Sequence, residues 1–324
     1  MQRSRALPKA LPGGTGMKKR MVSVSALLVC LIFLHMVVCA NGIAGDANNY
    51  LRVISDRTVK GFIHPESVAF DPLERVLYVS QFGSVLKPTL KDGKGKISKV
   101  SLAGEILEEK YLPSAGEVLN KPKGVWIEGN RLWVTDIDAV WVFDLRTRQG
   151  RKVMLPDARF ANDPTVVDNM LLVSDSQGGK IYGVEPADFL NEKGEPDIVV
   201  FVEGQSFSPN GLYPSHDGSL LTAGHSMKGQ NRSICSVNDE GKLKTLSIEP
   251  GRLDGIAQLK DGSLLITDWN SGALLRWDTR TGIKTLATGF AGPADFCIVP
   301  ENEELLVVVP DLVKSELRMI RLSR

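Results

Sequence analysis

Four side chains with oxygen atoms that can bind a cation precede apolar segments at matching places along the chain. They are Glu66 in His64-Pro-Glu-Ser-Val, Asn162 in Phe160-Ala-Asn-Asp-Pro, Asn210 in Ser208-Pro-Asn-Gly-Leu and Asp254 in Arg252-Leu-Asp-Gly-Ile. Two carboxylates and two amide carbonyls can balance a divalent cation, and such hard oxygen donors suit calcium. Each Asn-Gly or Asp-Gly pair taken singly is read equally well as a turn. The recurrence at one phase favours a shared metal site.

Histidine gives little support for a dedicated zinc site. Beyond the apolar N-terminal run, the chain contains His64, His216 and His225. No two of them have the spacing of zinc ligands. Calcium is therefore the expected cation, and Zn²⁺, Mn²⁺ and Mg²⁺ are kept as alternatives.

A repeat of strands must bring these four residues together. Each copy has a polar loop, an apolar strand, a turn, a second apolar strand, an Asp-containing loop and a third strand. Apart from a longer first interval, the copies recur at a spacing of roughly 40 to 46 residues, which is typical of four-stranded propeller blades. The second strands of the six copies are Val76–Ser80, Arg131–Asp136, Met170–Asp175, Ser219–Ala223, Ser263–Asp268 and Glu304–Val309. The repeat predicts an all-β, six-bladed β-propeller.

Turns and the chain ends support this interpretation. Asp217-Gly218 and Asp261-Gly262 separate consecutive apolar strands, where a hairpin turn needs residues that tolerate positive φ. The β-like segment 51–63 is expected to join the last blade beside residues 317–322 and close the ring, which removes exposed sheet edges. An open solenoid is the main alternative, because periodicity alone does not require closure.

The N-terminal region reads as an export signal. Six basic residues and no acid occupy the first twenty positions, and an apolar run follows from Met21 to Ala40. Met17 and Met21 are alternative starts. About twenty apolar residues also suffice to span a bilayer, so residues 1–44 are predicted to be a signal peptide or an N-terminal membrane anchor. Residues 45–324 are predicted to form the propeller, exported to the periplasm or secreted.

Charge narrows the range of partners. The formal net charge is +1, and without the basic N-terminal residues the remainder is net negative. A chain without a basic stripe is a poor binder of phosphate backbones. A small-molecule substrate is expected and nucleic acid is not. A membrane would be contacted only through an uncleaved N-terminal segment.

The motifs resemble those of the regucalcin, gluconolactonase and luciferin-regenerating-enzyme-like propellers, also called the senescence marker protein family. The resemblance extends from Val59 to the C-terminus, and the chain looks closer to exported bacterial members of this group. Its most specific parts are Pro-Glu-Ser around Glu66, the Asn162-Asp163 pair after Arg159, Pro-Asn-Gly around Asn210, and Leu-Asp-Gly around Asp254 followed by Thr267-Asp-Trp-Asn.

The resemblance implies a metal-dependent lactonase, a carboxylic ester hydrolase. It implies that Glu66, Asn210 and Asp254 bind the metal and that Asn162 contacts the metal or the substrate. Asp254 would also be the general base that helps deprotonate water, while Asn162 and Arg159 orient the substrate. The chain departs from the family pattern in one respect, because an additional residue separates Arg159 from the Asn162-Asp163 pair.

A second function class remains open at this stage. The same propeller could bind a small molecule or a protein without catalysis and keep the cation for structure, because one fold hosts many functions. The segment Gly224-His-Ser-Met-Lys228 lacks the last glycine of a hydrolase nucleophile elbow. Most tryptophans are expected to pack between blades, and Trp269 is the one whose position beside Asp268 suggests a role near a ligand.

Overall fold

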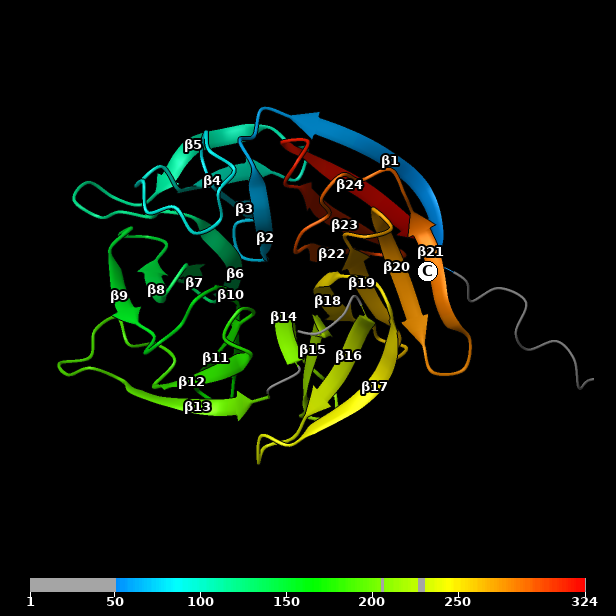
Figure 1. The fold of residues 1–324 in the computed structure, drawn as a ribbon. Coiled ribbons are helices and arrows are strands. Elements are labelled where there is room, and N and C mark those ends of the chain that lie inside the picture. The colour runs from blue at the N-terminus through cyan, green and yellow to red at the C-terminus, as the bar shows by residue number, and fades with distance from the viewer. Residues whose placement is uncertain (1–50, 205–206, 227–230, 324) are drawn as a thin grey trace, which may run out of the picture. The chain divides into compact units, whose positions relative to one another are not determined.

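The computed structural model describes residues 51–204, 207–226 and 231–323, which belong to one compact unit. Six antiparallel four-stranded sheets are arranged around a central axis (Figure 1). The predicted six-bladed β-propeller is therefore confirmed. None of these residues lies in a helix long and apolar enough to cross a membrane. The predicted signal peptide or anchor, residues 1–44, lies outside the described residues.

The first three blades each contain four consecutive strands, with the first strand innermost. Blade 1 consists of β2 (Pro65–Asp71), β3 (Val76–Gln81), β4 (Lys96–Ser101) and β5 (Ile106–Leu112). Blade 2 consists of β6 (Pro122–Glu128), β7 (Arg131–Asp136), β8 (Ala139–Asp144) and β9 (Gly150–Met154). Blade 3 consists of β10 (Ala161–Val167), β11 (Met170–Asp175), β12 (Lys180–Glu185) and β13 (Asp197–Glu203).

Blades 4 and 5 repeat this order, and blade 6 borrows a strand from the N-terminal side. Blade 4 consists of β14 (Phe207–Pro214), β15 (Leu220–Ser226), β16 (Asn231–Val237) and β17 (Leu243–Pro250). Blade 5 consists of β18 (Leu253–Gln258), β19 (Leu264–Asp268), β20 (Ala273–Asp278) and β21 (Gly282–Ala287). Blade 6 consists of β22 (Cys297–Glu301), β23 (Glu304–Asp311), β24 (Glu316–Ser323) and β1 (Arg52–Lys60).

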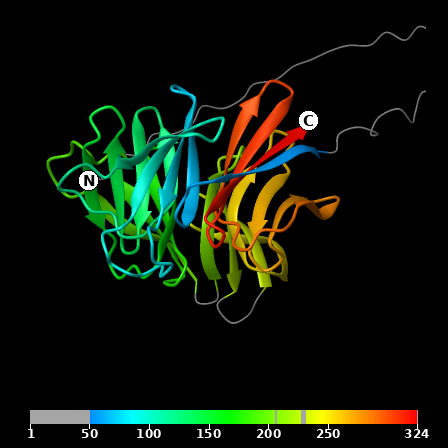
Figure 2. The same ribbon diagram turned by 90° about the horizontal axis from the view of Figure 1, so that it is seen from above.

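Ring closure follows the prediction. Strand β1 pairs antiparallel with β24, from Arg52 opposite Ser323 to Lys60 opposite Glu316. Figure 2 shows the blue β1 beside the red β24. The last blade thus combines both ends of the propeller sequence in one sheet, and closure pairs strands that would otherwise be edges. The expected hairpins are also present, because Gly218 and Gly262 both have φ of 84°.

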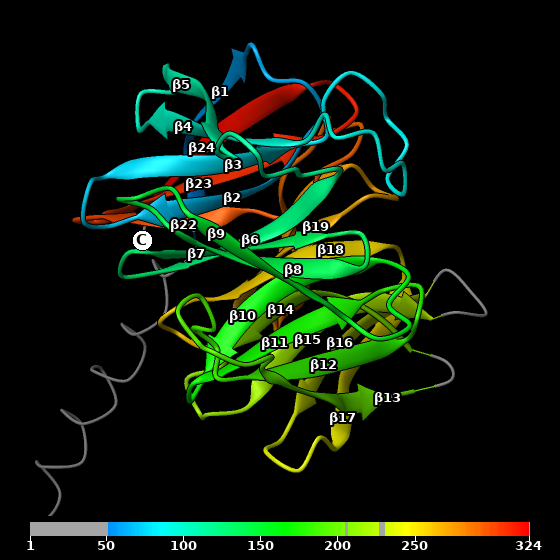
Figure 3. The ribbon, with the colours of Figure 1, turned by 90° about the vertical axis from the view of Figure 1, so that its left-hand side faces the viewer.

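Apolar side chains fill the spaces between neighbouring blades. Blades 2 and 3, which lie side by side in Figure 3, share a buried cluster that includes Trp133, Val142, Leu171 and Tyr182. Successive side chains along each strand point to opposite faces of the sheet. Each blade therefore packs against a neighbouring blade on both of its faces. The tryptophan at position 133 thus packs between blades as the sequence indicated.

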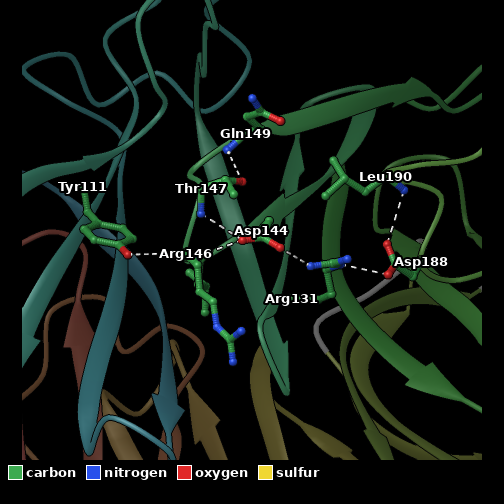
Figure 4. Close-up of polar contacts among 9 residues, drawn as sticks. Tyr111, Arg131, Asp144, Arg146, Thr147, Gln149, Asp188 and Leu190 are labelled. Atoms are coloured by element: carbon green, nitrogen blue, oxygen red, sulfur yellow. Dashed lines mark hydrogen bonds and ion pairs between the residues drawn. The ribbon is translucent and has the colours of Figure 1, made fainter.

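Polar contacts tie the same blades together farther from the axis (Figure 4). The Tyr111 hydroxyl of blade 1 donates to the Leu145 carbonyl of blade 2. Arg131 of blade 2 forms ion pairs with Asp144 of its own blade and, at 2.8 Å, with Asp188 of blade 3. The Tyr111 contact is buried, whereas the ion pairs of Arg131 are partly exposed to solvent, where ion pairs stabilise weakly.

A bulge recurs near the start of the innermost strands. In blade 1, Pro65 pairs with Gln81 and the register shifts by one residue before Val68 pairs with Val79. The same shift occurs between the first and fourth paired residues of β6, β10, β14 and β18. A bulge takes the extra residue out of the ladder and re-aims its side chain. It therefore sets the second and third residues of each bulge apart from the regular alternation.

Hydroxyl groups then fix these bulges to one another. A Ser or Thr near the end of the second strand donates to the carbonyl of the second bulge residue in the next blade. The pairs are Ser80 with Lys123 at 2.7 Å, Thr135 with Asn162, Ser174 with Asn210 at 2.7 Å, and Thr267 with Ala294 at 2.9 Å. The neighbouring Asp carboxylates accept backbone N–H groups from the loop before the innermost strand, as Asp175 does from Arg159 and Phe160. The repeat thus holds each bulge in place.

Candidate functional site

The second bulge residues of five blades gather at the axis, and we call them the inner ring. They are Glu66, Lys123, Asn162, Asn210 and Asp254, from blades 1 to 5 in order. The four residues predicted from sequence are between 5% and 8% exposed, and Lys123 is fully buried. The structure therefore brings the four predicted residues together and adds a lysine to them.

The position of the predicted residues differs from the expectation in one respect. The sequence suggested loops before the first strands, whereas all four residues lie within β2, β10, β14 and β18. The bulge explains the difference, because it lets a residue inside a paired strand leave the regular alternation. Strand residues are held more rigidly than loop residues, which suits a binding site.

Hydrogen bonds hold three members of the inner ring in place. The Asn162 Nδ2 atom donates to Asn210 Oδ1 and, at 3.2 Å, to Ser176 Oγ. The Asn210 Nδ2 atom donates to the Leu253 carbonyl at 3.3 Å. The Trp269 indole Nε1 donates to Asp254 Oδ2 at 2.6 Å. Trp269 therefore does lie at the site, where it holds one oxygen of Asp254.

Glu66 is the least satisfied member of the ring. Its Oε2 atom is buried and has no hydrogen-bond partner among the described residues. Burial raises the pKa of Glu66 well above its ordinary value, the charge of Asp254 raises it further, and Lys123 opposes this. An unpaired buried carboxylate oxygen is costly. A cation beside Glu66 would remove that cost.

Opposing influences act on the pKa of Asp254. Burial raises its pKa to about 6, while the Trp269 hydrogen bond and the charge of Arg252 act in the opposite direction. The charge of Asp254 raises the pKa of Glu66, so the two carboxylates lie within electrostatic reach of one another. Carboxylates with raised pKa values at one buried position are typical of functional sites.

A second tier of polar side chains comes from Ser67 and Asp163, the third bulge residues of blades 1 and 3, and from Asp295, which precedes β22 in blade 6. The Ser67 hydroxyl donates to Asp295 Oδ2 at 2.6 Å, and the Leu212 N–H donates to Asp163 Oδ2 at 2.7 Å. Burial raises the pKa of both acids, to about 7 for Asp295. The Asn162-Asp163 motif thus contributes one residue to each tier.

Glycine at the third bulge position of other blades makes room for the second tier. A Cβ on Gly124 would come within 2.4 Å of Asp163 Oδ1, and a Cβ on Gly255 within 2.8 Å of Asp295 Oδ1. Distances under about 3 Å require a neighbour to shift, so a side chain here would displace the acids. The glycines at positions 124 and 255 are therefore a packing requirement of the acids in the neighbouring blades.

Beyond the second tier lies a cavity of about 220 Å³. Its wall is largely apolar and aromatic, with Asp163 and Asp295 as its acidic residues. The aromatic lining residues are Phe70, Trp126, Tyr213 and Phe296. The second tier therefore lies between the inner ring and this cavity.

The donor set fits the predicted cation. No group of three or more His, Cys, Asp or Glu side chains within the described ranges has a metal-binding arrangement. A cation would therefore depend on the amide oxygens of Asn162 and Asn210 together with the carboxylates of Glu66 and Asp254. All four supply oxygen atoms, which hard cations such as calcium prefer. The Oε2 atom of Glu66, which is buried without a hydrogen-bond partner, is the structural feature that favours a bound cation at this site.

The predicted substrate residue Arg159 lies elsewhere on the blade. It is exposed and lines a surface groove with Asp157, Lys180 and Glu203. The arginine beside Asp254 is Arg252, whose guanidinium lies 5.1 Å from the centre of the Trp269 ring and whose charge lowers the pKa of Asp254. Sequence reasoning missed Arg252 although it begins the Leu-Asp-Gly motif.

Lys123 was also missed, and a signal for it exists. Pro122-Lys-Gly in blade 2 occupies the phase of Pro65-Glu-Ser and Pro209-Asn-Gly. A search for oxygen donors passes over lysine, whereas a search for any polar residue after the repeated proline finds it. Blade 6 has Ala294 at this place.

Comparisons with known proteins establish the fold and leave the function open. No protein-family model matches this sequence, and no curated protein matches it. A virginiamycin B lyase from Staphylococcus aureus with quinupristin is 15% identical, with a TM-score of 0.55 over 85% of this chain and 100% of its own. A candidate gluconolactonase is 14% identical, with a TM-score of 0.59 over 84% of this chain and 98% of its own. This chain shares the propeller fold with both.

Proposed function

We propose that the protein is a metal-dependent hydrolase that opens a lactone or a related cyclic ester. The observation that carries the proposal is the inner ring itself, in which the unpaired Glu66 Oε2 lies beside Asp254 and two amide side chains. Glu66, Asn162, Asn210 and Asp254 would hold a divalent cation, calcium foremost. When bound, the cation would polarise the ester carbonyl and stabilise the oxyanion.

Asp254 has the properties required of a general base. With its pKa raised to about 6, its carboxylate is ionised near neutral pH and can accept a proton from water. The Trp269 indole donates to Oδ2 and so fixes the orientation of the Asp254 carboxylate. The water oxygen bonds to the carbonyl carbon, the ring C–O bond breaks, and the departing oxygen takes up the proton. The product is a hydroxy acid.

Substrate binding would use the polar rim beside Asp254. Asn162 uses its two N–H groups on Ser176 and Asn210, so its Oδ1 is the atom that can accept a hydrogen bond from a substrate hydroxyl. Arg252 is exposed and stacks near Trp269, so it can contact a substrate oxygen without moving the ring. We assign Arg252 the orienting role that the resemblance gave to Arg159. The likeness in fold to a candidate gluconolactonase supports a lactone as the substrate class.

The test is turnover of a panel of sugar and aromatic lactones by the full chain with Ca²⁺, Mn²⁺, Zn²⁺ or Mg²⁺, beside the Asp254→Asn variant. Loss of the general base should lower kcat by about 10²- to 10⁴-fold while the protein stays folded. Asp261→Asn is the matched control, because this acid lies in an exposed turn of the same blade and pairs with Arg276. The control should keep full activity.

Two results would contradict the proposal. Asp254→Asn with undiminished turnover would remove Asp254 from the reaction. No turnover of any lactone with any of the four metals would favour a propeller that binds a small molecule or a protein without catalysis. Circular dichroism and urea unfolding of both variants would show that the folded state is present.

The proposal includes export through residues 1–44. The basic start and apolar run of this segment support it. Expression of the full chain followed by cell fractionation should place the protein outside the cytoplasm, and N-terminal sequencing of the mature form should begin close to residue 45. A protein found intact in the cytoplasm would contradict this part.

A further inference from the structure

Two lysines near the axis are fully buried, and they differ in how their ammonium groups are satisfied. Lys121 Nζ donates to the Phe82 carbonyl at 2.9 Å, to the Val85 carbonyl at 3.1 Å and to Asp92 Oδ2 at 2.8 Å. All three N–H groups of its ammonium are therefore used. This residue ties the loop after β3 to blade 2 and has a complete structural role.

Lys123 has no such set of partners. Among the described residues its one hydrogen bond is to the Lys121 carbonyl, at 3.4 Å. The Nζ atom also lies 4.4 Å from the centre of the Phe160 ring. The ring face attracts a cation, but phenylalanine has no acceptor atom for a hydrogen bond. A fully buried ammonium with one long hydrogen bond requires another source of stabilisation.

Nearby acids provide that source. Lys123 occupies in blade 2 the bulge position that Glu66 occupies in blade 1, and the Ser80 hydroxyl of blade 1 donates to the Lys123 carbonyl at 2.7 Å. Glu66 is the first of the charges that favour the ammonium of Lys123, followed by Asp136, Asp138 and Asp175. In return, Lys123 is the charge that lowers the pKa of Glu66 against burial and Asp254.

We propose that Lys123 is the internal counter-ion of the inner ring and that it weakens the affinity of the ring for divalent cations. The inference rests on the proposed function, because it concerns the cation site of that function. The ammonium balances Glu66 when no other cation is present, and it repels an incoming cation that shares the same carboxylates. Lys123 thereby prevents the acids from holding a metal with the full strength of their charge.

The proposal predicts opposite results for two substitutions of Lys123. Lys123→Met removes the charge and keeps a chain of similar length, so Ca²⁺ should bind at least about tenfold more tightly, because charge repulsion across a buried site is large. Lys123→Arg keeps the charge, so its affinity should stay within about threefold of the wild type. Lys121→Met is the matched control, since it removes a buried ammonium that lies outside the inner ring.

Isothermal calorimetry of the full chain with Ca²⁺ alone at pH 7 measures these affinities. A second readout is the luminescence of Tb³⁺ excited through tryptophan, with Ca²⁺ as competitor, since Trp269 donates to Asp254. A third is the rise in urea midpoint with added Ca²⁺, which reports binding even if Lys123→Met is less stable without metal.

The outcomes separate the inference from the proposed function. Tighter binding by Lys123→Met, with Lys123→Arg and Lys121→Met near the wild type, would support the inference. Wild-type binding that Lys123→Met leaves unchanged or weakens would overturn it and leave the cation site intact. If neither the wild type nor Lys123→Met binds Ca²⁺ or Tb³⁺, both the cation site and the inference are wrong.

Discussion

Lys121 with its partners Phe82, Val85 and Asp92, here called the Lys121 clamp, differs from the inner ring in one physical respect. Both bury charge next to the axis of the propeller. The clamp pairs its ammonium with one carboxylate and two carbonyls. The inner ring leaves Glu66 Oε2 without a partner and gives Lys123 a single long hydrogen bond.

The difference separates a structural role from a binding role. A buried charged group whose hydrogen bonds are all made within the protein has no capacity left to bind a ligand. Its removal destabilises the folded state. A charge that is buried without partners costs stability, and a fold retains it where a ligand can use it. Two regions a few residues apart in sequence can thus be distinguished by counting the partners of their buried charges.

The largest effect on stability should come from the clamp. Lys121→Met leaves Asp92 without its cation and removes three hydrogen bonds, so the free energy of unfolding should fall by about 3 kcal/mol. Urea unfolding measures this change. Because the clamp does not touch the inner ring acids, lactone turnover of the folded variant should be within about threefold of the wild type. A stable variant without activity would reverse the assignment of the two regions.

The next effect concerns pH and the second tier. Asp295 has a pKa raised to about 7 in the folded protein, against about 3.8 for a free side chain, so the folded state binds more protons between these values. Its contribution therefore favours the folded state at low pH and is lost as pH rises toward 7. With a metal chelator present, the free energy of unfolding of Asp295→Asn should rise by about 1 to 2 kcal/mol relative to that of the wild type between pH 5 and pH 8.

Urea unfolding of both proteins at several pH values tests this. A relative stability that does not change with pH would show that Asp295 has no raised pKa. The partial exposure of Asp295 to the cavity is the reason for expecting less than the full value of the shift.

A smaller effect should follow from loosening Asp254 without removing it. Trp269→Phe keeps an aromatic ring beside Arg252 but deletes the N–H that donates to Asp254 Oδ2. Loss of one hydrogen bond to a charged group should reduce kcat about tenfold. Steady-state kinetics should show the change in kcat more than in KM. An unchanged kcat would mean that the indole does not position the base.

The smallest effect should come from the outer contacts in Figure 4. Arg131→Met breaks ion pairs with Asp144 and Asp188, both of which are partly exposed to solvent. The expected loss of unfolding free energy is under about 1 kcal/mol, with no change in turnover. A larger loss would show that the contacts between blades 2 and 3 depend on this arginine, and it would weaken the view that the buried charges are the important ones.

Much of the fold could be predicted from sequence because each blade repeats the same local chemistry. The apolar strands, the Asp-Gly turns and the segment that closes the ring are all encoded in short stretches of residues. The common phase of Glu66, Asn162, Asn210 and Asp254 likewise followed from the repeat. Their place inside strands did not, because a bulge depends on the pairing of two strands and leaves no fixed residue pattern.

The electrostatic character of the site was harder to predict. Lys123 shares the phase of the oxygen ligands but not their chemistry, so a search for metal donors passed over it. Trp269 is 15 residues from Asp254 in sequence and donates to it only when blade 5 is folded, which also brings the ring of Trp269 beside Arg252. The roles of Asp163 and Asp295 depend on glycines in other blades that leave room for them.

Anomalous diffraction from crystals of the full chain grown with Mn²⁺, whose ligand preferences overlap those of calcium, would locate a cation bound to the inner ring. We expect one strong peak at the axis, within about 2.0–2.6 Å of oxygen atoms of Glu66, Asn210 and Asp254. A peak bound elsewhere, or none at the inner ring with Mn²⁺ in excess, would contradict the proposed cation site.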